Sequence, residues 1–214
     1  MNTSWTRSAL AVTLSTLLAA CNSGGGSSAG NSHNGIDSNT PDTNKQPSTA
    51  ALTPVDFNRL TDSALQSCIA DTGIEYQEQL QLLECPHLTI STLAGLEQFT
   101  EIRVLNLTNN QLQSVAELQG MSKLAWLDIS HNQLNDINYL HNLTQLTSLQ
   151  ASHNQLNSID TLQLTKLNKL YINDNQLSSL NFIGTLPALK HLTAHNNPST
   201  VPGSIPETLE TFSI

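Results

Sequence analysis

Hydrophobic and polar residues recur along most of this chain in one order and at one spacing. The pattern is L-x-x-L-x-L-x-x-N-x-L, and residues 102–112 form one clear copy of it. Further copies begin at Leu124, Leu146, Leu167 and Leu189, so the intervals between copies are 22, 22, 21 and 22 residues. Each copy keeps an asparagine at the same place, and these residues are Asn110, Asn132, Asn154, Asn175 and Asn197. A random leucine-rich sequence would not hold one polar residue in register, so the pattern is a structural repeat.

The two halves of each copy predict different local structures. In the first half, apolar residues such as Leu127 and Ile129 alternate with polar ones, which predicts a short strand with one buried face. In the second half, the spacing of Ile137, Leu140 and Leu143 predicts a helical or 3₁₀ turn on the opposite side. A period of about 20 to 29 residues with this pattern indicates an α/β solenoid of leucine-rich repeats. We therefore expect a right-handed arc with parallel strands on its concave face and short 3₁₀, helical or extended segments on its convex face.

The asparagines in register, which we call the asparagine ladder, are expected to turn the chain out of each strand. An asparagine amide can both donate to and accept from the backbone groups that such a turn leaves unpaired. The alternative, that these are ordinary surface residues of loops, does not explain their regular phase. Asn109, which precedes the first ladder asparagine, is expected to be exposed and to tolerate alanine.

The repeats at the two ends depart from the pattern. The first begins at Leu80 and has Leu88 where the asparagine should stand. After Asn197, prolines at 198, 202 and 206 favour an extended convex segment, because proline lacks the N–H that a helix needs. A last strand is expected near the end, with no polar cap after it in this sequence. The predicted repeat domain covers residues 80–214 as about six repeats and a partial last strand.

The repeats of residues 80–214 resemble a known class. Their 22-residue pattern is similar to the leucine-rich repeats of bacterial internalins and of a eukaryotic phosphatase-regulating subunit. The resemblance implies the fold, whereas its motifs do not specify a partner.

The first 20 residues have the features of an export signal. They contain no acidic residue and one arginine, Arg7, which an apolar stretch from Ala9 to Ala20 follows. That stretch is too short to span a bilayer, which takes about 20 residues, and its order is that of a signal peptide. The run Leu18-Ala19-Ala20-Cys21 resembles a bacterial lipobox, which implies a lipoprotein signal peptide at 1–20 and lipidation, including palmitate, of Cys21. A plain secretory signal with an incidental cysteine is the alternative. Asn22 favours the outer membrane by the sorting rule of that family.

The segment that follows differs in composition from the repeats. Residues 21–51 are rich in Gly, Ser and Asn and offer little to bury, which predicts a disordered tether from the lipidated Cys21. Without residues 1–20 the chain has 7 basic residues against 17 acidic ones. Nucleic-acid binding requires clustered basic residues, so we expect no nucleic-acid partner. Attachment to a membrane would then depend on the lipid of Cys21.

The two remaining cysteines are expected to pair. Disulfides persist in exported proteins, and Cys68 and Cys85 form an even pair. Cys85 falls at an inward strand position, and Cys68 lies in the segment 62–73, which has the start and stop signals of a helix. We therefore predict a small helical N-terminal cap at 52–79 that is joined to the first repeat. Two buried free thiols are the alternative.

The sequence offers little for catalysis or metal binding. It contains none of the common metal, nucleotide or nucleophile motifs, so no catalytic residue, cofactor or small-molecule substrate is expected. His131 and His153 should stack on adjacent repeats about 5 Å apart. Asp174 or His87 falls in the same column and could supply a third ligand. A surface histidine ladder is the simpler interpretation, and we predict no metal site.

The concave wall is then the expected functional surface, and a protein is the expected partner. Trp126 and Tyr171 are large aromatic residues at outward strand positions, with Asp128, Gln150 and Asn173 beside them. Tryptophan and tyrosine are enriched among residues that dominate interfaces. The sequence thus predicts a bacterial envelope lipoprotein that binds a protein through this wall. The alternatives are a structural envelope component without a specific ligand and a metal-dependent factor.

Overall fold

The fold is a stack of short repeats that begins with a small cap. The computed structural model describes residues 51–159, 162–199 and 205–214. The predicted signal peptide, Cys21 and all but the last residue of the predicted tether lie outside the described residues. What was said of them above stays a prediction.

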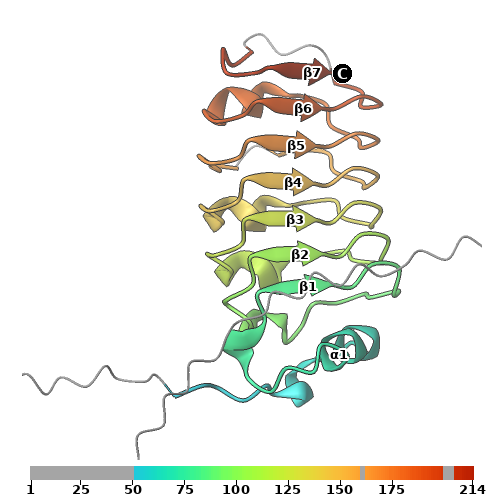
Figure 1. Cartoon of the computed structure of the whole chain (residues 1–214). Coiled ribbons are helices and arrows are strands. Elements are labelled where there is room, and N and C mark those ends of the chain that lie inside the picture. The colour runs from blue at the N-terminus through green and yellow to red at the C-terminus, as the bar shows by residue number, and fades with distance from the viewer. Residues whose placement is uncertain (1–50, 160–161, 200–204) are drawn as a thin grey trace, which may run out of the picture. The chain divides into compact units, whose positions relative to one another are not determined.

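One parallel sheet runs through the whole described part of the chain. Each of its seven strands has three residues and pairs with the strands of the neighbouring repeats, in chain order. Figure 1 shows them one above the other. They are β1 (Leu82–Glu84), β2 (Val104–Asn106), β3 (Trp126–Asp128), β4 (Ser148–Gln150), β5 (Lys169–Tyr171), β6 (His191–Thr193) and β7 (Thr211–Ser213). The predicted leucine-rich-repeat solenoid is confirmed, and β7 lies where a last strand was expected.

The opposite side of four of the repeats holds a 3₁₀ turn. They are η3 (Leu96–Gln98), η4 (Ala116–Gly120), η5 (Asn138–Asn142) and η6 (Asn181–Thr185). This is the predicted short helical turn. The repeat that begins at Leu146 has no such helix among its described residues, which exclude 160 and 161. The extended segment predicted around the prolines falls largely on 200–204, outside the described residues.

A continuous core fills the space between the sheet and the 3₁₀ turns. The central residue of β1 to β6 is always leucine, and every one of these leucines is at most 1% exposed. The paired register places each leucine directly beside the next, for example Leu105 beside Leu127. Burying one leucine side chain stabilises a protein by about 2 kcal/mol. Because each repeat shares this core with its neighbours, no repeat could bury its strand alone.

The asparagine ladder joins each repeat to the one before it. Asn132 is 8% exposed, and its Nδ2 donates to the carbonyl oxygens of Leu107 at 3.0 Å and Ile129 at 3.1 Å. Its Oδ1 accepts from the backbone N–H of Leu112 at 3.0 Å. Equivalent bonds recur at the other ladder residues, Asn110, Asn154, Asn175 and Asn197. The side chains thus satisfy turn groups that the short strands leave without a partner.

The residue before each ladder asparagine adopts a left-handed backbone. The φ angles at these positions lie between 54° and 58°, and the residues are Asn109, His131, His153, Asp174 and Asn196. Asparagine, aspartate and histidine are the non-glycine residues that most often occupy this region. The expectation that Asn109 tolerates alanine is therefore wrong. Its side chain is exposed, but alanine in this conformation costs about 1–2 kcal/mol.

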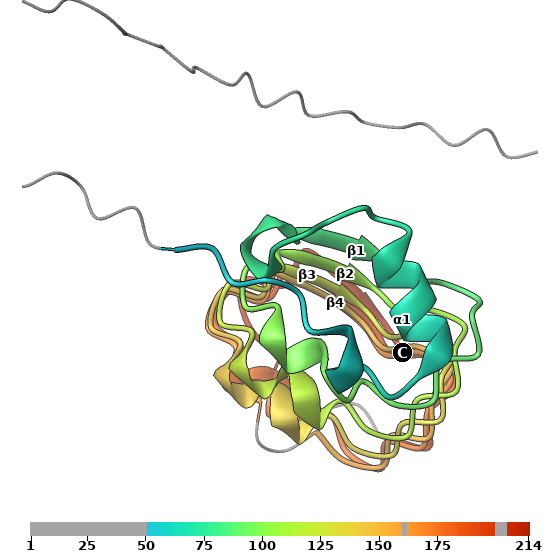
Figure 2. The same cartoon turned by 90° about the horizontal axis from the view of Figure 1, so that it is seen from below.

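A helix and two 3₁₀ turns precede the first strand. They are η1 (Phe57–Arg59), α1 (Ser63–Ala70) and η2 (Gln77–Gln79). Leu65 and Ile69 of α1 are fully buried in the same core as the repeats. Figure 2, seen from the β1 end of the stack, shows α1 lying across that end.

The cap is tied to the first repeat by a covalent bond and by Asp62. Cys68 of α1 and Cys85 are joined in a disulfide, with their Cα atoms 5.9 Å apart. Asp62 accepts from the N–H groups of Ala64 and Leu65 at the start of α1. Its second oxygen accepts from the N–H and hydroxyl of Ser91.

Among the described residues, no helix combines the length and apolar character that a membrane span requires.

Candidate functional site

The concave wall presents two columns of side chains to solvent. The first column consists of the first residue of each strand, and it aligns Val104, Trp126, Ser148, Lys169 and His191. The second consists of the last residue of each strand, and it aligns Asn106, Asp128, Gln150, Tyr171 and Thr193. The middle residue between the two columns points into the core. A partner on this wall therefore contacts side chains at alternate positions only.

The predicted partner-binding residues divide between two hollows. Asp128, Gln150, Tyr171 and Asn173 line one hollow, on the side where the strands end, and we call it the carboxyl-end hollow. Trp126 lines another hollow, on the side where the strands begin. The structure thus places Trp126 and Tyr171 two strands apart and in different columns. The two rings do not share one pocket.

The carboxyl-end hollow is polar and contains the histidine pair. The rings of His131 and His153 are stacked, with centroids 4.0 Å apart and planes inclined by 14°. Nε2 of His153 lies 3.4 Å from a carboxylate oxygen of Asp174. Burial lowers the pKa of His131, and the charge of His153 lowers it further, while Asp128 and Asp174 oppose the shift. The lowered pKa favours the neutral form of the His131 ring.

The histidine column does not assemble a metal centre. Across the residues that the structure describes, no three His, Cys, Asp or Glu side chains converge in a group that could hold an ion. His87 and Asp174 do share the column, as the sequence indicated, but they do not complete such a group with the two stacked rings. The left-handed backbone that His131 and His153 adopt explains why these residue types recur there.

Three serines at outward positions of the wall are nearly buried. Ser130, Ser148 and Ser152 stand at outward positions, yet each is at most 9% exposed. Ser152 Oγ also accepts from the N–H of Asn173 at 3.2 Å. The wall therefore offers fewer polar groups than the alternation of residues implies, and Ser148 is a small, sunken position beside Trp126.

The second hollow on the wall, which we call the amino-end hollow, combines an aromatic ring with two lysines. It is lined by Trp126, Thr147, Ser148, Lys166, Asn168 and Lys169. Lys166 donates to Oε1 of Gln145 at 2.6 Å. Neither lysine was among the partner-binding residues predicted from the sequence. Lys169 occupies the same outward position in its repeat as Trp126.

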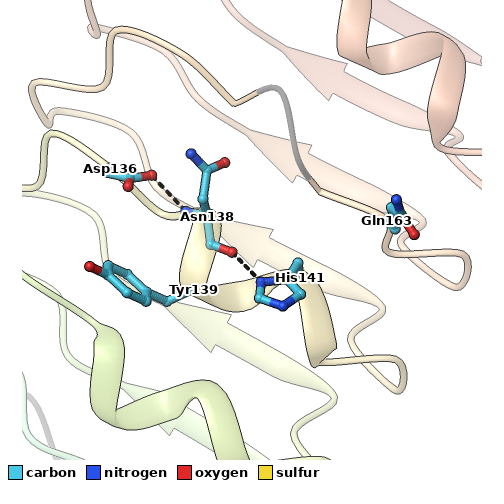
Figure 3. A pocket seen from close by; sticks show the side chains of 5 residues that line it. All are labelled: Asp136, Asn138, Tyr139, His141 and Gln163. Carbon is cyan, nitrogen blue, oxygen red and sulfur yellow. Dashed lines mark hydrogen bonds between the residues drawn. The ribbon is translucent and has the colours of Figure 1, made fainter.

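A third hollow lies on the convex side, beside the repeat that is one residue shorter. It is lined by Asp136, Asn138, Tyr139, His141 and Gln163, which Figure 3 shows as sticks. Asp136 accepts from the N–H of Asn138 at 2.7 Å, and Nδ1 of His141 lies 2.7 Å from the carbonyl oxygen of Asn138. These contacts order η5 itself. None of these five residues was predicted from the sequence to form a site.

Comparisons with known proteins agree with this architecture. Residues 100–156 match the family model described as leucine rich repeat. An internalin of Listeria monocytogenes is similar in structure, with a TM-score of 0.53 and 21% sequence identity, over 69% of this chain and 54% of that chain. A leucine-rich-repeat protein of Leptospira interrogans has a TM-score of 0.51 and 27% identity, over 58% of this chain and 34% of that chain. No curated protein matches the sequence.

This chain spans about half the length of the internalin and about a third of the Leptospira protein. The likeness to the internalin concerns the fold, which includes stacked parallel strands and short turns on the opposite side. A fold of this kind favours protein–protein interaction, because it presents an extended face to a partner. The described part of the chain is thus a leucine-rich-repeat solenoid, and its residues 100–156 match the leucine rich repeat family model.

Proposed function

We propose that this protein is a cell-envelope lipoprotein whose repeats bind another protein through the concave wall. The observation that carries the proposal is the partial exposure of two large aromatic side chains, Trp126 and Tyr171, at outward positions of that wall. Tryptophan and tyrosine supply much contact area for little loss of side-chain freedom. No enzymatic role is proposed, since internalin-like repeats are interaction modules.

The size of the wall sets the strength of binding by the strands alone. Seven strands at about 4.8 Å give a wall roughly 30 Å long, and three residues give a width of about 10 Å. The area of this wall is therefore only a few hundred Å², whereas each partner buries roughly 800 Å² in a standard interface. Strong binding therefore requires the two hollows at the edges of the wall to take part.

The attachment to a membrane rests on the sequence around Cys21. A lipid on this residue and a tether of about 30 residues would hold the repeats near a bilayer without fixing their orientation. We expect Cys21→Ala to abolish incorporation of labelled palmitate and to shift the protein out of the membrane fraction. Unchanged labelling and fractionation of the variant would remove the anchor from the proposal, and with it the outer-membrane location.

The partner can be sought by proximity labelling on intact cells and its site mapped by titration calorimetry. Trp126→Ala and Tyr171→Ala should each weaken binding at least tenfold, about 1.4 kcal/mol. Gln119→Ala, on the exposed side of η4, is the control and should change affinity less than twofold. Unchanged affinity in both aromatic variants would move the site off the wall.

Two other functions predict different results in the same preparation. A structural envelope component without a ligand would show no saturable partner. A metal-dependent factor would carry stoichiometric metal, and the stacked pair of His131 and His153 is the one observation in its favour. Elemental analysis of the purified protein decides that case.

A further inference from the structure

We propose that the amino-end hollow binds a carboxylate of the protein partner, from an acidic side chain that lies next to an apolar one. This inference rests on the proposed function, and it names the chemistry that meets one edge of the wall. It follows from where the positive charges of the chain lie, from which of them are neutralised, and from the shape of the surface around Trp126.

Positive charge gathers along the edge where the strands begin. The described part of the chain has six basic residues, and five of them stand at or shortly before the first residue of a strand: Arg103, Lys123, Lys166, Lys169 and Lys190. Acidic residues stand at the opposite edge, where the strands end, and include Glu84, Asp128 and Asp174. An acidic protein thus carries a basic edge along one side of its wall.

Two of the lysines on this edge are neutralised within the protein. Lys123 pairs with Glu101, and Nζ of Lys190 lies 2.7 Å from Oε1 of Glu210. The hydrogen bond from Lys190 and its charge lower the pKa of Glu210, so this carboxylate stays ionised. The positive charges of Lys123 and Lys190 are therefore largely cancelled by these two glutamates.

The two lysines of the amino-end hollow are not neutralised. Lys166 donates to the neutral amide of Gln145, and Lys169 is exposed. Neither makes an ion pair with any carboxylate of the described residues. Two uncompensated ammonium groups on one concave surface raise the local concentration of anions.

The surface between Trp126 and Lys169 has room for one side chain. These residues lie on β3 and β5 in the same column, with Ser148 of β4 between them. Trp126 and Lys169 are therefore two strand spacings apart, which is about 10 Å. Ser148 is short, and it lines the amino-end hollow together with Trp126 and Lys169. A side chain that enters there can place its carboxylate at Lys169 and its carbon atoms against the indole.

Anionic and cationic quenchers of tryptophan fluorescence test the local charge without a partner. The chain has two tryptophans, Trp5 and Trp126, so Trp5→Phe in the full-length protein leaves Trp126 as the reporter. At constant ionic strength, iodide should quench Trp126 at least twice as efficiently as caesium, after each is normalised to a free tryptophan standard. In the double variant Lys166→Gln, Lys169→Gln the two efficiencies should become equal. Equal efficiencies before the substitution would overturn the proposal.

A pair of synthetic peptides tests the ligand class. The acidic probe is acetyl-Leu-Glu-Glu-Leu-amide, and its matched control is acetyl-Leu-Gln-Gln-Leu-amide. The acidic peptide should change Trp126 fluorescence saturably and bind at least tenfold more tightly than the neutral one. Lys169→Gln should remove at least tenfold of that affinity. Arg59→Gln removes the same charge from the cap, away from the wall, and should change it less than twofold.

The outcomes separate this inference from the function on which it rests. Equal binding of the two peptides, or acidic binding that survives Lys169→Gln, overturns the inference. If a protein partner then loses affinity in Trp126→Ala and Tyr171→Ala but not in Lys169→Gln, the proposed function stands without it. If the acidic peptide binds as expected and no protein needs the wall, the carboxylate site stands and the proposed function fails.

Discussion

Replacing one asparagine of the ladder by leucine tests how these side chains stabilise the stack. Asn154 is central, with an exposed fraction of 8%. Its Nδ2 donates to the carbonyl oxygens of Ile129 at 3.0 Å, Ala151 at 3.2 Å and Ser152 at 3.3 Å. Each of these oxygens also accepts from a second donor, either a neighbouring ladder asparagine or a backbone N–H. Loss of the Nδ2 donor therefore leaves none of the three without a partner.

The acceptor side of Asn154 is different. Its Oδ1 accepts from the backbone N–H of Leu134 at 3.0 Å, in a buried position. In Asn154→Leu this N–H loses its partner, and an unsatisfied buried donor costs about 1–3 kcal/mol. The side chains are similar in size, so packing adds little. We expect the free energy of unfolding to fall by about 2 kcal/mol, and the Tm by about 4–8 °C.

Circular dichroism during heating and urea unfolding measures this loss. Gln155→Ala is the matched control, because Gln155 is the next residue, its side chain is exposed, and its N–H bonds to the backbone in any case. The control should change the Tm by less than 2 °C. A loss in Asn154→Leu no larger than in Gln155→Ala would refute the role assigned to Oδ1.

Asn154→Asp separates the acceptor from the donor. Aspartate keeps an oxygen for the N–H of Leu134, but its carboxylate would face the carbonyl oxygens that Nδ2 now contacts. This repulsion should raise the pKa of the new side chain, because the protonated form can donate to those oxygens. A raised pKa gives stability that is present below the unfolded pKa of about 3.9 and lost as the pH rises through the folded pKa. The Tm deficit relative to the wild type should therefore be smaller at pH 4 than at pH 7, and an equal deficit contradicts the assignment.

Three further substitutions test the cap. Asp62→Ala should cost about 1–2 kcal/mol, because the helix loses its cap. Burial raises the pKa of Asp62, but its hydrogen bonds to Ser91, Leu65 and Ala64 together lower the pKa below its ordinary value. The stabilisation is therefore present above about pH 4 and is lost as the pH falls further, which acid unfolding of the wild type and the variant measures. Cys68→Ser with Cys85→Ser opens a loop with a sequence separation of 17 and should cost about 3 kcal/mol in urea unfolding, whereas a change below 1 kcal/mol contradicts this. Gly95→Ala should lower the Tm by more than 5 °C, because Gly95 has a φ of 92° and a Cβ there would overlap backbone atoms of the cap; Gly120→Ala, where a Cβ meets nothing within 4 Å, is the control.

The sequence predicted the repeating part of the fold because that part is set by local rules. A leucine at the centre of a three-residue strand and an asparagine at each turn have one role in every repeat, so five copies specify them five times. The left-handed residue before each ladder asparagine was missed for Asn109. Its side chain carries no sign of burial, and only the recurrence of Asn, His and Asp at that position signals the backbone conformation.

The sites were harder to predict, since they depend on how residues from different repeats meet. The sequence brought Trp126 and Tyr171 together as one anchor pair, but the register of β3, β4 and β5 assigns them to different columns and hollows. Ser148 also occupies an outward position of its strand, yet it is at most 9% exposed. The exposure of an outward side chain depends on the sizes of its neighbours in adjacent repeats. The repeat pattern alone does not specify those sizes.

The outward strand positions are where this chain can encode a partner. Inward leucines, ladder asparagines and left-handed turn residues are constrained by the stack, so they change little from repeat to repeat. The first column, in contrast, runs from Trp126 through Ser148 to Lys169 on three successive strands. No requirement of the fold explains a large ring, a sunken hydroxyl and a free ammonium in that order. Their combination produces a basic hollow with an aromatic wall in an acidic protein, and this departure from the repeat is the reason to look there for the partner.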